Sequence, residues 1–426
     1  MTSASVLTDY DVVVIGAGAA GLAAGRHLAR AAINFRILEA RSRIGGRAFT
    51  AAAGEFPLDL GCGWLHSADI NPWTAILAGL GFTIDKTPPA WGRHSLDLGF
   101  SPEEQIAFDR AITAFRQDLA TAARETPDRA AASLFAPEDR FNPLIAAVTT
   151  YASGTEPERL SIHDTANYAD TGFNWRVVEG YGAGIAAFGH DLPISLACPV
   201  TRLDHSGPRL RLDTPQGVIT AAKVIITLPT NLLATEALVF DPPLPDKCAA
   251  AAVLPLGIAD KLVLALDRPL NLPKDGHLFG RIDRTDTASY HLRPFGRNLI
   301  EAYFGGQLAA DLEIDGPAAF YAFAEDELSD LLGSSIKARL RPVAETAWGR
   351  DPYARGSYSY ALPGHAEARG KLVEPVEERI FFAGEACSKN AFSTARGAYL
   401  TGLAAAEAVL AGLAGLAAFA SLPSAH

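Results

Sequence analysis

The chain has 426 residues, of which 49% are apolar and 20% charged, a composition that supports a large buried core and excludes wholesale disorder. At about 150 residues per domain, this length predicts two to three structural units. The formal net charge is −11, from 37 basic and 48 acidic side chains. Because nucleic-acid binding relies on a basic face, nucleic acid is not expected as a partner.

Cysteines are few and widely spaced. Cys62, Cys198, Cys248 and Cys387 form no CxxC pair and no cluster with histidine at metal-ligand spacing, so no metal site is predicted. So few cysteines in a long chain suit a reducing compartment. The first ten residues carry no basic segment typical of a secretion signal, and we expect a cytoplasmic location.

The first pattern in chain order is a strand, a glycine run and a helix. The β-branched residues 11–15 predict a buried strand, and a GxGxxG motif with Gly16, Gly18 and Gly21 follows at once. Residues 22–32 are rich in good helix formers, and residues 35–38 predict a second strand that ends at Glu39. This order is that of a βαβ unit with a dinucleotide-binding turn.

Each of these residues has a physical role in binding a dinucleotide. Gly16 permits the tight turn, Gly18 lets the backbone approach a pyrophosphate, and Gly21 lets the helix pack close to the strand. The helix N-terminus offers free N–H groups and a positive dipole end to phosphates. Glu39 is placed to accept hydrogen bonds from ribose hydroxyls, and an acid at that position disfavours NADP.

A basic, glycine-containing segment follows the second strand. Arg41, Arg43 and Arg47 flank the pair Gly45-Gly46. Arginines here can neutralise a pyrophosphate, and the glycines let the chain pass close to a flat ring, which favours FAD over NAD. Taken alone, the segment is equally compatible with a basic loop that contains a turn.

The middle of the chain changes character. Ser101 followed by Pro102, Glu103 and Glu104 is a strong helix start, and helical patterning continues with breaks to about residue 151. Helices inserted after a Rossmann-like start suggest a substrate or lid subdomain. Strands are then predicted at residues 200–203, 209–212, 218–219 and 223–229, and a second sheet at residues 262–266, 298–303 and 358–362.

The end of the chain returns to an α/β pattern. Residues 379–383 predict a strand, 384–386 a turn and 394–410 a helix, and the first and last strands are expected in one sheet. The apolar tail, residues 408–420, has about 13 residues, whereas a membrane-spanning helix needs about 20. We therefore expect a packed helix end and no stable membrane anchor.

Several motifs together resemble one enzyme family. Residues 39–47, EARSRIGGR, resemble the E-x-R-x-R-x-G-G-R signature of the flavin-containing amine oxidases. Further segments resemble the same family in the same order: 60–66 (LGCGWLH), 348–352 (WGRDP), 356–360 (GSYSY), 381–386 (FFAGEA) and 397–402 (GAYLTG). The Trp-Leu-His segment, followed by Asn71-Pro72, is similar to the polyamine oxidase branch. The resemblance covers most of the chain, except the helical region from about residue 101 to residue 170.

The resemblance implies an α/β fold, in which a Rossmann-like FAD-binding domain is interleaved with an α+β substrate-binding domain carrying a helical subdomain. We expect residues 1–75, 190–250 and 370–426 in the FAD-binding domain, and residues 76–189 and 251–369 in the substrate-binding domain. Ser357 stands where monoamine oxidases carry the flavin-linked cysteine, which implies non-covalent FAD. Cys387, near the flavin segment, is the alternative candidate for attachment.

The same resemblance implies a set of flavin contacts. Arg41 and Arg47 are expected near the phosphates and the flavin, and Glu385 at the ribityl-phosphate end. Val200 matches the position whose backbone meets the adenine, and its alternative is a core strand residue. The residues expected to contact FAD are Gly16, Gly18, Ala19, Gly21, Glu39, Arg41, Gly46, Arg47, Gly63, Trp64, Val200, Gly384, Glu385 and Thr394.

Lys261 matches the family's active-site lysine, which holds a water against flavin N5. Taken alone, a lysine at the start of an apolar strand is more simply a strand-end side chain that reaches solvent. We expect burial to lower its basicity, and activity to rise with pH as the amine and Lys261 titrate. Trp348 and Tyr358 match aromatic positions beside the flavin, where they steer an amine and exclude water, and their alternative is ordinary core packing.

His66 matches the histidine of the Trp-Leu-His motif, which implies a hydrogen bond to the substrate amine. Its alternative is a structural histidine. Ser67 departs from the glycine of many relatives, and Thr394 from the cage tyrosine of monoamine oxidases, so a sandwich of two tyrosines is not expected. Longer amines held by carboxylates are then favoured, and the candidate carboxylates are Asp170, Glu179 and Glu301.

These implications predict an FAD-dependent oxidase of primary or secondary amines, polyamine-like in substrate. A hydride would pass from the amine α-carbon to flavin N5, the imine would hydrolyse to an aldehyde, and molecular oxygen would yield hydrogen peroxide. Two alternatives on the same scaffold stay open: an FAD-dependent desaturase, and an L-amino-acid oxidase using Arg93, Arg176, Arg293 or Arg396. A third is a flavin-binding protein without catalysis. The sequence does not indicate an oligomeric state.

Overall fold

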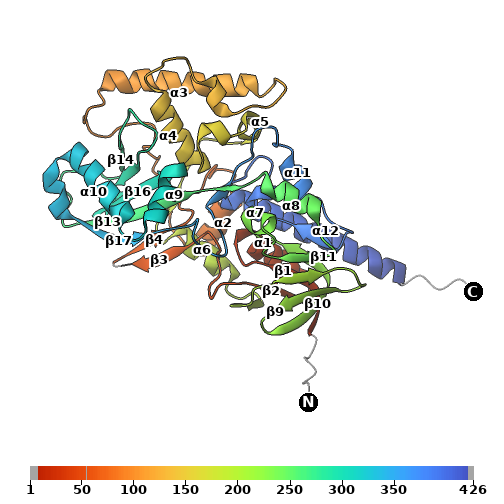
Figure 1. Cartoon of the computed structure of the whole chain (residues 1–426). Helices are drawn as coiled ribbons and strands as arrows, with labels where there is room; N and C mark the ends of the chain where they lie inside the picture. The colour runs from red at the N-terminus through yellow and green to blue at the C-terminus, as the bar shows by residue number, and fades with distance from the viewer. Residues whose placement is uncertain (1–7, 54, 421–426) are drawn as a thin grey trace, which may run out of the picture.

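The computed structural model describes residues 8–53 and 55–420, and its fold is the predicted α/β arrangement (Figure 1). The predicted absence of a secretion signal concerns in part residues 1–7, which lie outside the described residues. Two sheets define two units. They are joined by several crossings of the chain, so that the first and last segments of the sequence lie in one unit.

The first sheet has eight strands around the predicted N-terminal strand. β1 pairs in parallel with β2 and β10, and β10 also pairs in parallel with β19 near the C-terminus. Val12, Val13 and Val14 are fully buried, as a strand covered on both faces requires. The strands, in sheet order, are β11 (Val239–Asp241), β8 (Arg202–Asp204), β9 (Leu210–Thr214), β10 (Gly217–Ile226), β1 (Thr8–Ile15), β2 (Phe35–Leu38) and β7 (Ile194–Ser195), with β19 (Ile380–Phe382) beside β10.

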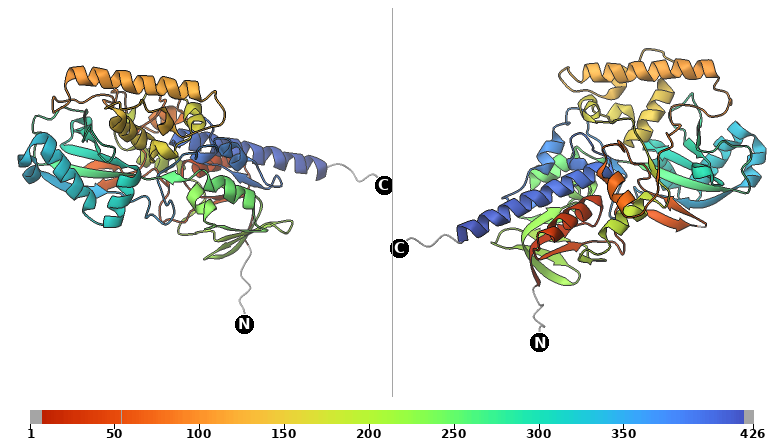
Figure 2. Two further views of the ribbon diagram at one scale, coloured as in Figure 1. Left: turned by 45° about the horizontal axis from the view of Figure 1, so that its top comes forward. Right: turned by 180° about the vertical axis from the view of Figure 1, so that it is seen from behind.

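Two helices from opposite ends of the chain cover this sheet side by side. They are α1 (Ala19–Arg30) and α12 (Ala395–Ala420), and Figure 2 shows that α12 continues beyond α1. The helix is longer than the predicted 394–410. Its residues Ala395–Ala414 are long and apolar enough, by length and composition, to cross a membrane, and a third of the most apolar window is buried. A core helix of a soluble protein can be equally long and apolar, so length and composition alone do not identify α12 as a membrane span. We predicted that residues 408–420 form a packed helix end, but the side chains of residues 415–420 lie outside the described part of the structure.

The second sheet forms the other unit of the molecule. It is antiparallel in the order β14 (Gly276–Phe279), β15 (Ser289–Leu292), β16 (Leu299–Gly305), β13 (Ala259–Leu266) and β17 (Leu340–Glu345). One face packs on α9 (Gly306–Asp315) and α10 (Ala319–Leu332) through Leu262, Leu264 and Phe304. Because side chains alternate along a strand, Lys261, Glu301 and Tyr303 lie on the opposite face.

The predicted helical subdomain lies above this sheet (Figure 1). It contains α3 (Pro102–Ala122), α4 (Asn142–Ser153) and α5 (Ile162–Asn167). Ser101 caps α3 as expected: its Oγ accepts a hydrogen bond from Glu104 N at 3.3 Å, and the Glu104 carboxylate accepts one from Ser101 N at 3.1 Å.

Shorter strands and helices complete the two units and the segments between them. The strand pairs are β3 (Thr50–Ala53) with β4 (Phe56–Asp59), β5 (Ile84–Asp85) with β6 (Arg176–Val177), and β12 (Leu256–Gly257) with β18 (Tyr358–Ser359). The remaining α-helices are α2 (Pro72–Gly79), α6 (Tyr181–Gly189), α7 (Thr230–Ala234), α8 (Pro245–Ala252) and α11 (Ala368–Val373). The 3₁₀ helices are η1 (Ala131–Leu134), η2 (Pro157–Arg159), η3 (Pro294–Gly296), η4 (Ser334–Arg339) and η5 (Glu385–Cys387).

Two strand predictions were wrong in detail. Residues 218–219 and 223–229 form one strand, β10, which ends at Ile226, and Pro229 instead precedes α7. Residues 358–362 do not join the second sheet: only Tyr358 and Ser359 are extended, and they pair with β12. A two-residue strand leaves no alternation in the sequence from which its partner could be predicted.

Candidate functional site

The glycine turn between β1 and α1 has the geometry of a phosphate loop. Gly16 has φ +101°, and a Cβ on Gly21 would lie 1.9 Å from the carbonyl oxygen of Gly16, so both positions require glycine. A Cβ on Gly18, by contrast, would meet no atom nearer than 3.9 Å, from Gly46 Cα. The helix α1 begins at Ala19 directly after Gly18, and no side chain caps its N-terminus, so its first backbone N–H groups are available to a phosphate.

Glu39 lies at the end of β2 beside this turn and is 5% exposed. Its Oε2 accepts a hydrogen bond from Ala17 N at 2.7 Å, and its Oε1 accepts one from Arg41 N at 2.8 Å. These bonds fix the carboxylate next to the glycine turn. Because a carboxylate offers about four acceptor positions, it retains capacity for the hydroxyls of a ribose.

The predicted arginines are held by carboxylates and carbonyls. Arg41 makes a two-pronged ion pair with Asp351, with both N–O distances 2.7 Å. Arg47 Nη1 donates to Glu385 Oε1 at 2.9 Å and to the carbonyl of Ser357 at 2.6 Å. Both contacts join the first unit to the segment that follows β17, so these arginines connect the predicted cofactor site to the substrate side.

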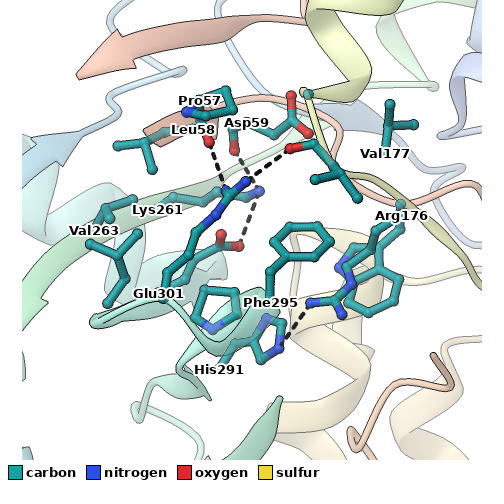
Figure 3. Close-up of a pocket in the computed structure, with 17 residues that line it drawn as sticks. Pro57, Leu58, Asp59, Arg176, Val177, Lys261, Val263, His291, Phe295 and Glu301 are labelled. Atoms are coloured by element: carbon teal, nitrogen blue, oxygen red, sulfur yellow. Dashed lines mark hydrogen bonds and ion pairs between the residues drawn. The ribbon is translucent and has the colours of Figure 1, made fainter. Parts of the chain in front are cut away.

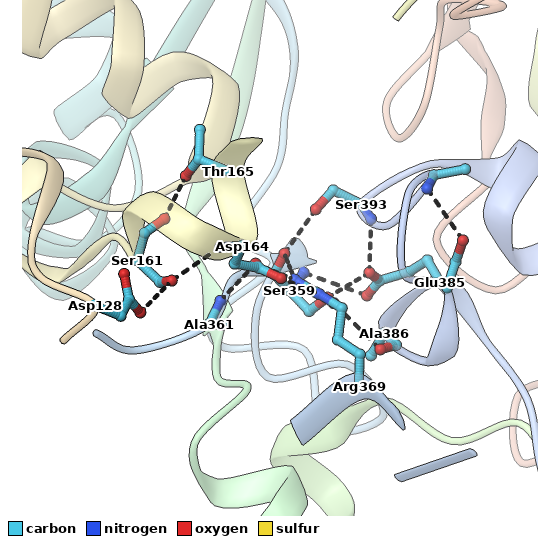
Figure 4. A network of polar contacts seen from close by, with 12 residues as sticks. Asp128, Ser161, Asp164, Thr165, Ser359, Ala361, Arg369, Glu385, Ala386 and Ser393 are labelled. Carbon is cyan, nitrogen blue, oxygen red and sulfur yellow. Dashed lines mark hydrogen bonds and ion pairs between the residues drawn. The ribbon is translucent and has the colours of Figure 1, made fainter. Parts of the chain in front are cut away.

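Glu385 is the centre of a buried polar network (Figure 4). Its Oε2 accepts from Ser359 Oγ at 2.6 Å and from Ser393 N at 2.9 Å, while Arg369 donates to Ser359 Oγ at 2.8 Å. Burial alone raises the pKa of Glu385, but Arg47, the Ser359 hydroxyl and Arg369 outweigh burial and hold this pKa below its usual value. Glu385 is therefore ionised, although it is 6% exposed.

A narrow groove lies at the carboxyl ends of β10 and β19. Its walls come from Arg47, residues 226–229 and residues 382–387, which include Gly384. Val200 is buried just before β8, and Thr394 Oγ1 accepts from Gly397 N at 3.0 Å at the start of α12. An open-sided glycine turn, a ribose acid and a groove at the strand ends fit an extended dinucleotide.

Lys261 lies close to Asp59 and Glu301 (Figure 3). Its Nζ donates to the carbonyl of Asp59 at 2.8 Å and lies 3.1 Å from Glu301 Oε1. A Cβ on Gly63 would be 3.3 Å from this Nζ, so the loop that carries Gly63 and Trp64 passes directly over the lysine. The side chain is 8% exposed, which excludes a strand-end lysine that reaches bulk solvent.

The expected loss of basicity at Lys261 was wrong. Burial alone lowers the pKa of Lys261, but the negative charges of Glu301 and Asp59 outweigh it and raise this pKa above its ordinary value. The counter-charge comes from β16 and from the end of β4, both far from Lys261 in sequence. Lys261 is therefore a fixed cation and does not contribute to a rise of activity near neutral pH.

A cavity lies beside Lys261, between strands of the second sheet and the segments that contain β4, β6 and the Gly63–Trp64 loop. Figure 3 shows Lys261, Glu301, His291, Phe295 and Arg176 around it. The residues that line it are Pro57, Leu58, Asp59, Gly63, Trp64, Arg176, Val177, Val178, Gly180, Lys261, Val263, His291, Pro294, Phe295, Arg297, Leu299 and Glu301.

The two predicted aromatic residues, Trp348 and Tyr358, do not line this cavity, and each is held by a different hydrogen-bond partner. Trp348 is 8% exposed, and its indole Nε1 donates to the carbonyl of Leu60 at 3.1 Å. The Tyr358 hydroxyl lies 2.9 Å from the Tyr303 hydroxyl, and Tyr303 is the residue opposite Lys261 in the β13–β16 pair. Burial raises the pKa of Tyr358 well above its ordinary value, so the phenol stays neutral.

His66 is held by the side chain of Asn174, in the segment that follows α5. Its Nδ1 lies 2.7 Å from Asn174 Oδ1, and burial lowers the pKa of His66. A neutral ring that donates from Nδ1 leaves Nε2 as an acceptor. The next aromatic neighbour is Trp91, whose ring centre is 6.0 Å from His66 and 4.6 Å from Trp64.

Among the candidate carboxylates, Glu301 alone lines the cavity. Glu179 accepts from Thr83 N at 2.8 Å, and Asp170 accepts from Gly172 N at 2.9 Å in a turn. Two candidate arginines have partners of their own. Arg176 pairs with Asp85 and Asp275, and Arg293 donates to the carbonyls of Leu272 and Gly296.

Sequence reasoning missed Tyr303, Asp59 and Trp91. Alternation along residues 299–305 places Glu301 and Tyr303 on one face of a strand, and this was a usable signal. The pairing of that face with Lys261 needed the strand register, which the sequence does not contain.

Comparison with known proteins agrees with this geometry. A model of the family described as flavin containing amine oxidoreductase matches residues 102–410, and a model of an NAD(P)-binding Rossmann-like domain matches residues 14–80. The chain belongs to the flavin-containing amine oxidoreductase family. The predicted family and its FAD cofactor are thereby confirmed.

Individual relatives are distant but nearly full-length. Polyamine oxidase 4 of Oryza sativa subsp. japonica is 27% identical over 441 aligned positions, which cover 93% of this chain and 88% of the relative. Polyamine oxidase 2 of Arabidopsis thaliana is 28% identical, with 93% and 87% covered. A structure of putrescine oxidase bound to putrescine has a TM-score of 0.78 at 19% identity, covering 95% of this chain and all of that one, which shows a shared fold.

Proposed function

We propose that this FAD-dependent amine oxidase acts on diamines or polyamines. The observation that carries the proposal is Lys261, a buried cation under the Gly63–Trp64 loop, at the head of a cavity that contains the Glu301 carboxylate. The polyamine oxidase relatives, which are matched over most of their length, support the same substrate class. Molecular oxygen as electron acceptor and a cytoplasmic location are part of this proposal.

The cofactor residues have separate tasks in the proposal. Gly16, Gly18, Ala19 and Gly21 hold the pyrophosphate, and Glu39 holds the ribose of the adenosine. Arg47 and Glu385 hold the ribityl side, and Val200 borders the adenine. Arg41, neutralised by Asp351, positions the loop of residues 41–47. The residues that border the flavin ring are Gly46, Gly63, Trp64, Gly384 and Thr394. The bound flavin supplies the two-electron acceptor for amine oxidation.

FAD attachment is non-covalent in this proposal. Ser357 Oγ donates to the carbonyl of Ala259 at 2.7 Å and accepts from Ala259 N at 2.8 Å, so a hydroxyl with no thiol chemistry fills this position. Burial raises the pKa of Cys387 to about 12, which suppresses the thiolate needed for attachment. Acid precipitation is expected to release all flavin into the supernatant, and flavin retained in the pellet would contradict this.

The protein side of the reaction is orientation and exclusion of water. His66 Nε2 is available as an acceptor for an amine N–H, while Trp348 and Tyr358 supply apolar ring surface that excludes water. A neutral amine enters more readily than an ammonium beside the Lys261 cation, so deprotonation precedes binding. No residue is required as a strong base.

The test is a substrate panel with peroxide detection on the FAD-loaded protein. Putrescine, spermidine and spermine are expected to give the highest kcat/KM, with matched monoamines lower and amino acids unreactive. Preference for an amino acid would overturn the polyamine assignment in favour of the amino-acid oxidase alternative. Reduction of the flavin without peroxide would identify a dehydrogenase.

A further inference from the structure

Glu301 meets Lys261 through the register of two neighbouring strands. In the antiparallel β13–β16 pair, Lys261 lies opposite Tyr303 and Val263 lies opposite Glu301, so Glu301 is a diagonal neighbour on the same face. The distance from Lys261 Nζ to Glu301 Oε1 is 3.1 Å, and the carbonyl of Asp59 holds the same Nζ at 2.8 Å (Figure 3). The lysine side chain is 8% exposed and that of Glu301 23% exposed.

A buried ammonium needs a counter-charge, because burial without one favours the neutral amine. Within the described part of the chain, Glu301 is the carboxylate paired with Lys261. The Asp59 carboxylate is engaged elsewhere: it accepts hydrogen bonds from Thr50 Oγ1, from Tyr181 N at 2.8 Å and from Gly182 N at 3.1 Å.

The other titratable groups around Lys261 do not replace Glu301. Burial raises the pKa of Cys62 to about 12 and raises that of Tyr303, so both stay neutral. Burial also raises the pKa of Asp59, and its negative charge supports the Lys261 ammonium less than that of Glu301 does. The remaining charged or titratable groups that line the cavity are Arg176, Arg297 and His291. Arg176 is already paired with Asp85 and Asp275, and none of these three groups offers a negative charge that could replace Glu301.

We propose that Glu301 is a positioning residue for the oxidase reaction, which keeps the Lys261 ammonium charged and fixed under the Gly63–Trp64 loop. The inference rests on the proposed function, since it gives Lys261 a task at the flavin. A permanent cation there stabilises negative charge that develops when oxygen accepts electrons. The competing use of Glu301, as the site for the distal ammonium of the substrate, is an outcome of the test.

The decisive variant is Glu301→Gln, which preserves size and removes the charge. The FAD-loaded protein is reduced chemically, so no amine is needed, and its reoxidation by oxygen is followed from about pH 6 to about pH 10, below the ordinary lysine pKa of about 10.4. The wild type is expected to show a flat profile. In Glu301→Gln the rate is expected to fall by about tenfold or more across this range as Lys261 loses its proton.

A second readout does not depend on turnover. The midpoint potential of the bound flavin is expected to become pH-dependent in Glu301→Gln with the same apparent pKa as reoxidation, because one nearby positive charge disappears. Glu301→Asp is expected to restore a flat profile. The matched control is Glu345→Gln, because Glu345 lies on β17 opposite Leu262 and is exposed, and this variant is expected to behave like the wild type.

Two results would overturn the proposal. One is a flat reoxidation profile in Glu301→Gln that still retains its flavin. The other is an effect confined to KM for diamines, with monoamines and chemical reoxidation unchanged, which would make Glu301 a substrate site. If no amine reduces the flavin of the wild type, the proposed function fails while the reoxidation profiles still decide the role of Glu301.

Discussion

At the scale of single residues, Lys261 illustrates what neighbouring strands add to a sequence pattern. Its position at the start of an apolar strand, taken alone, favoured a strand-end lysine that reaches solvent, and only the family resemblance predicted an active-site lysine. Its charge state depends on Glu301 and on Asp59, which lies 202 residues earlier in the chain. That pairing is a property of register and chain crossing, so it could not be predicted from the residues around Lys261.

Removal of the lysine charge gives the first prediction. Lys261→Met is expected to slow reoxidation of the reduced flavin by about 100-fold, the usual cost of losing one preorganised electrostatic group. The measurement is rapid mixing of reduced protein with oxygenated buffer. Flavin content is expected to stay at the wild-type level, because the predicted phosphate and ribose contacts lie in the other unit.

Lys371→Met is the matched control, since Lys371 is exposed on α11. It is expected to reoxidise at the wild-type rate. Equal rates for Lys261→Met and the wild type would contradict a role of the lysine at the flavin.

At the scale of elements, local patterns predicted the βαβ unit and the capped start of α3, whereas contacts between elements were not predicted. The clearest case is the ion pair of Asp164 on α5 with Arg369 on α11, which is bidentate at 2.7 and 2.8 Å with both side chains 1% exposed. This pair joins the helical subdomain to Ser359 and, through it, to Glu385 (Figure 4).

Breaking that pair gives the second prediction. Asp164→Asn leaves the buried Arg369 charge without a partner, which costs about 3–5 kcal/mol of unfolding free energy. Denaturant unfolding of the FAD-loaded protein measures the loss. Asp191→Asn breaks the exposed pair of Asp191 with Arg26 and is expected to cost at most about 1 kcal/mol. Equal stability of Asp164→Asn and the wild type would show that the network contributes nothing.

The third prediction concerns the carboxyl pair that supports the Trp348 segment. Glu313 on α9 accepts from Gly349 N at 2.8 Å, and Asp260 on β13 accepts from Trp348 N at 3.0 Å. Burial, together with a hydrogen bond and charge repulsion from Asp260, raises the pKa of Glu313 to about 8. The native state therefore holds a proton that the unfolded chain releases near the ordinary glutamate pKa of 4.5.

The sign of the pH dependence follows from linkage. The stability contributed by protonated Glu313 is fully present below about pH 4.5 and is lost as the pH rises to about 8. Glu313→Gln removes this titration, so the variant is expected to gain stability relative to the wild type between pH 5 and pH 8, as measured by unfolding at both values. Asp311→Asn, an exposed change on the same helix, is the control. A constant difference between Glu313→Gln and the wild type would contradict the assignment.

At the scale of the whole molecule, the sequence allowed the α/β class and the flavin family to be predicted, because the phosphate turn and the ribose acid are adjacent in the chain. The cavity could not be predicted. Its walls come from β4, β6, β13, β16 and η3, and its charge balance depends on pairs such as Arg176 with Asp85 and Asp275. These elements are far apart in the sequence, and local periodicity does not indicate which of them meet.

The most direct test of the central claim is anaerobic mixing of the FAD-loaded protein with putrescine. The account predicts a yellow protein whose oxidised flavin band bleaches completely with one amine per flavin and returns when air is admitted, with peroxide formed in equal amount. A protein that stays colourless after FAD is supplied, or a flavin band that no amine bleaches, would contradict it.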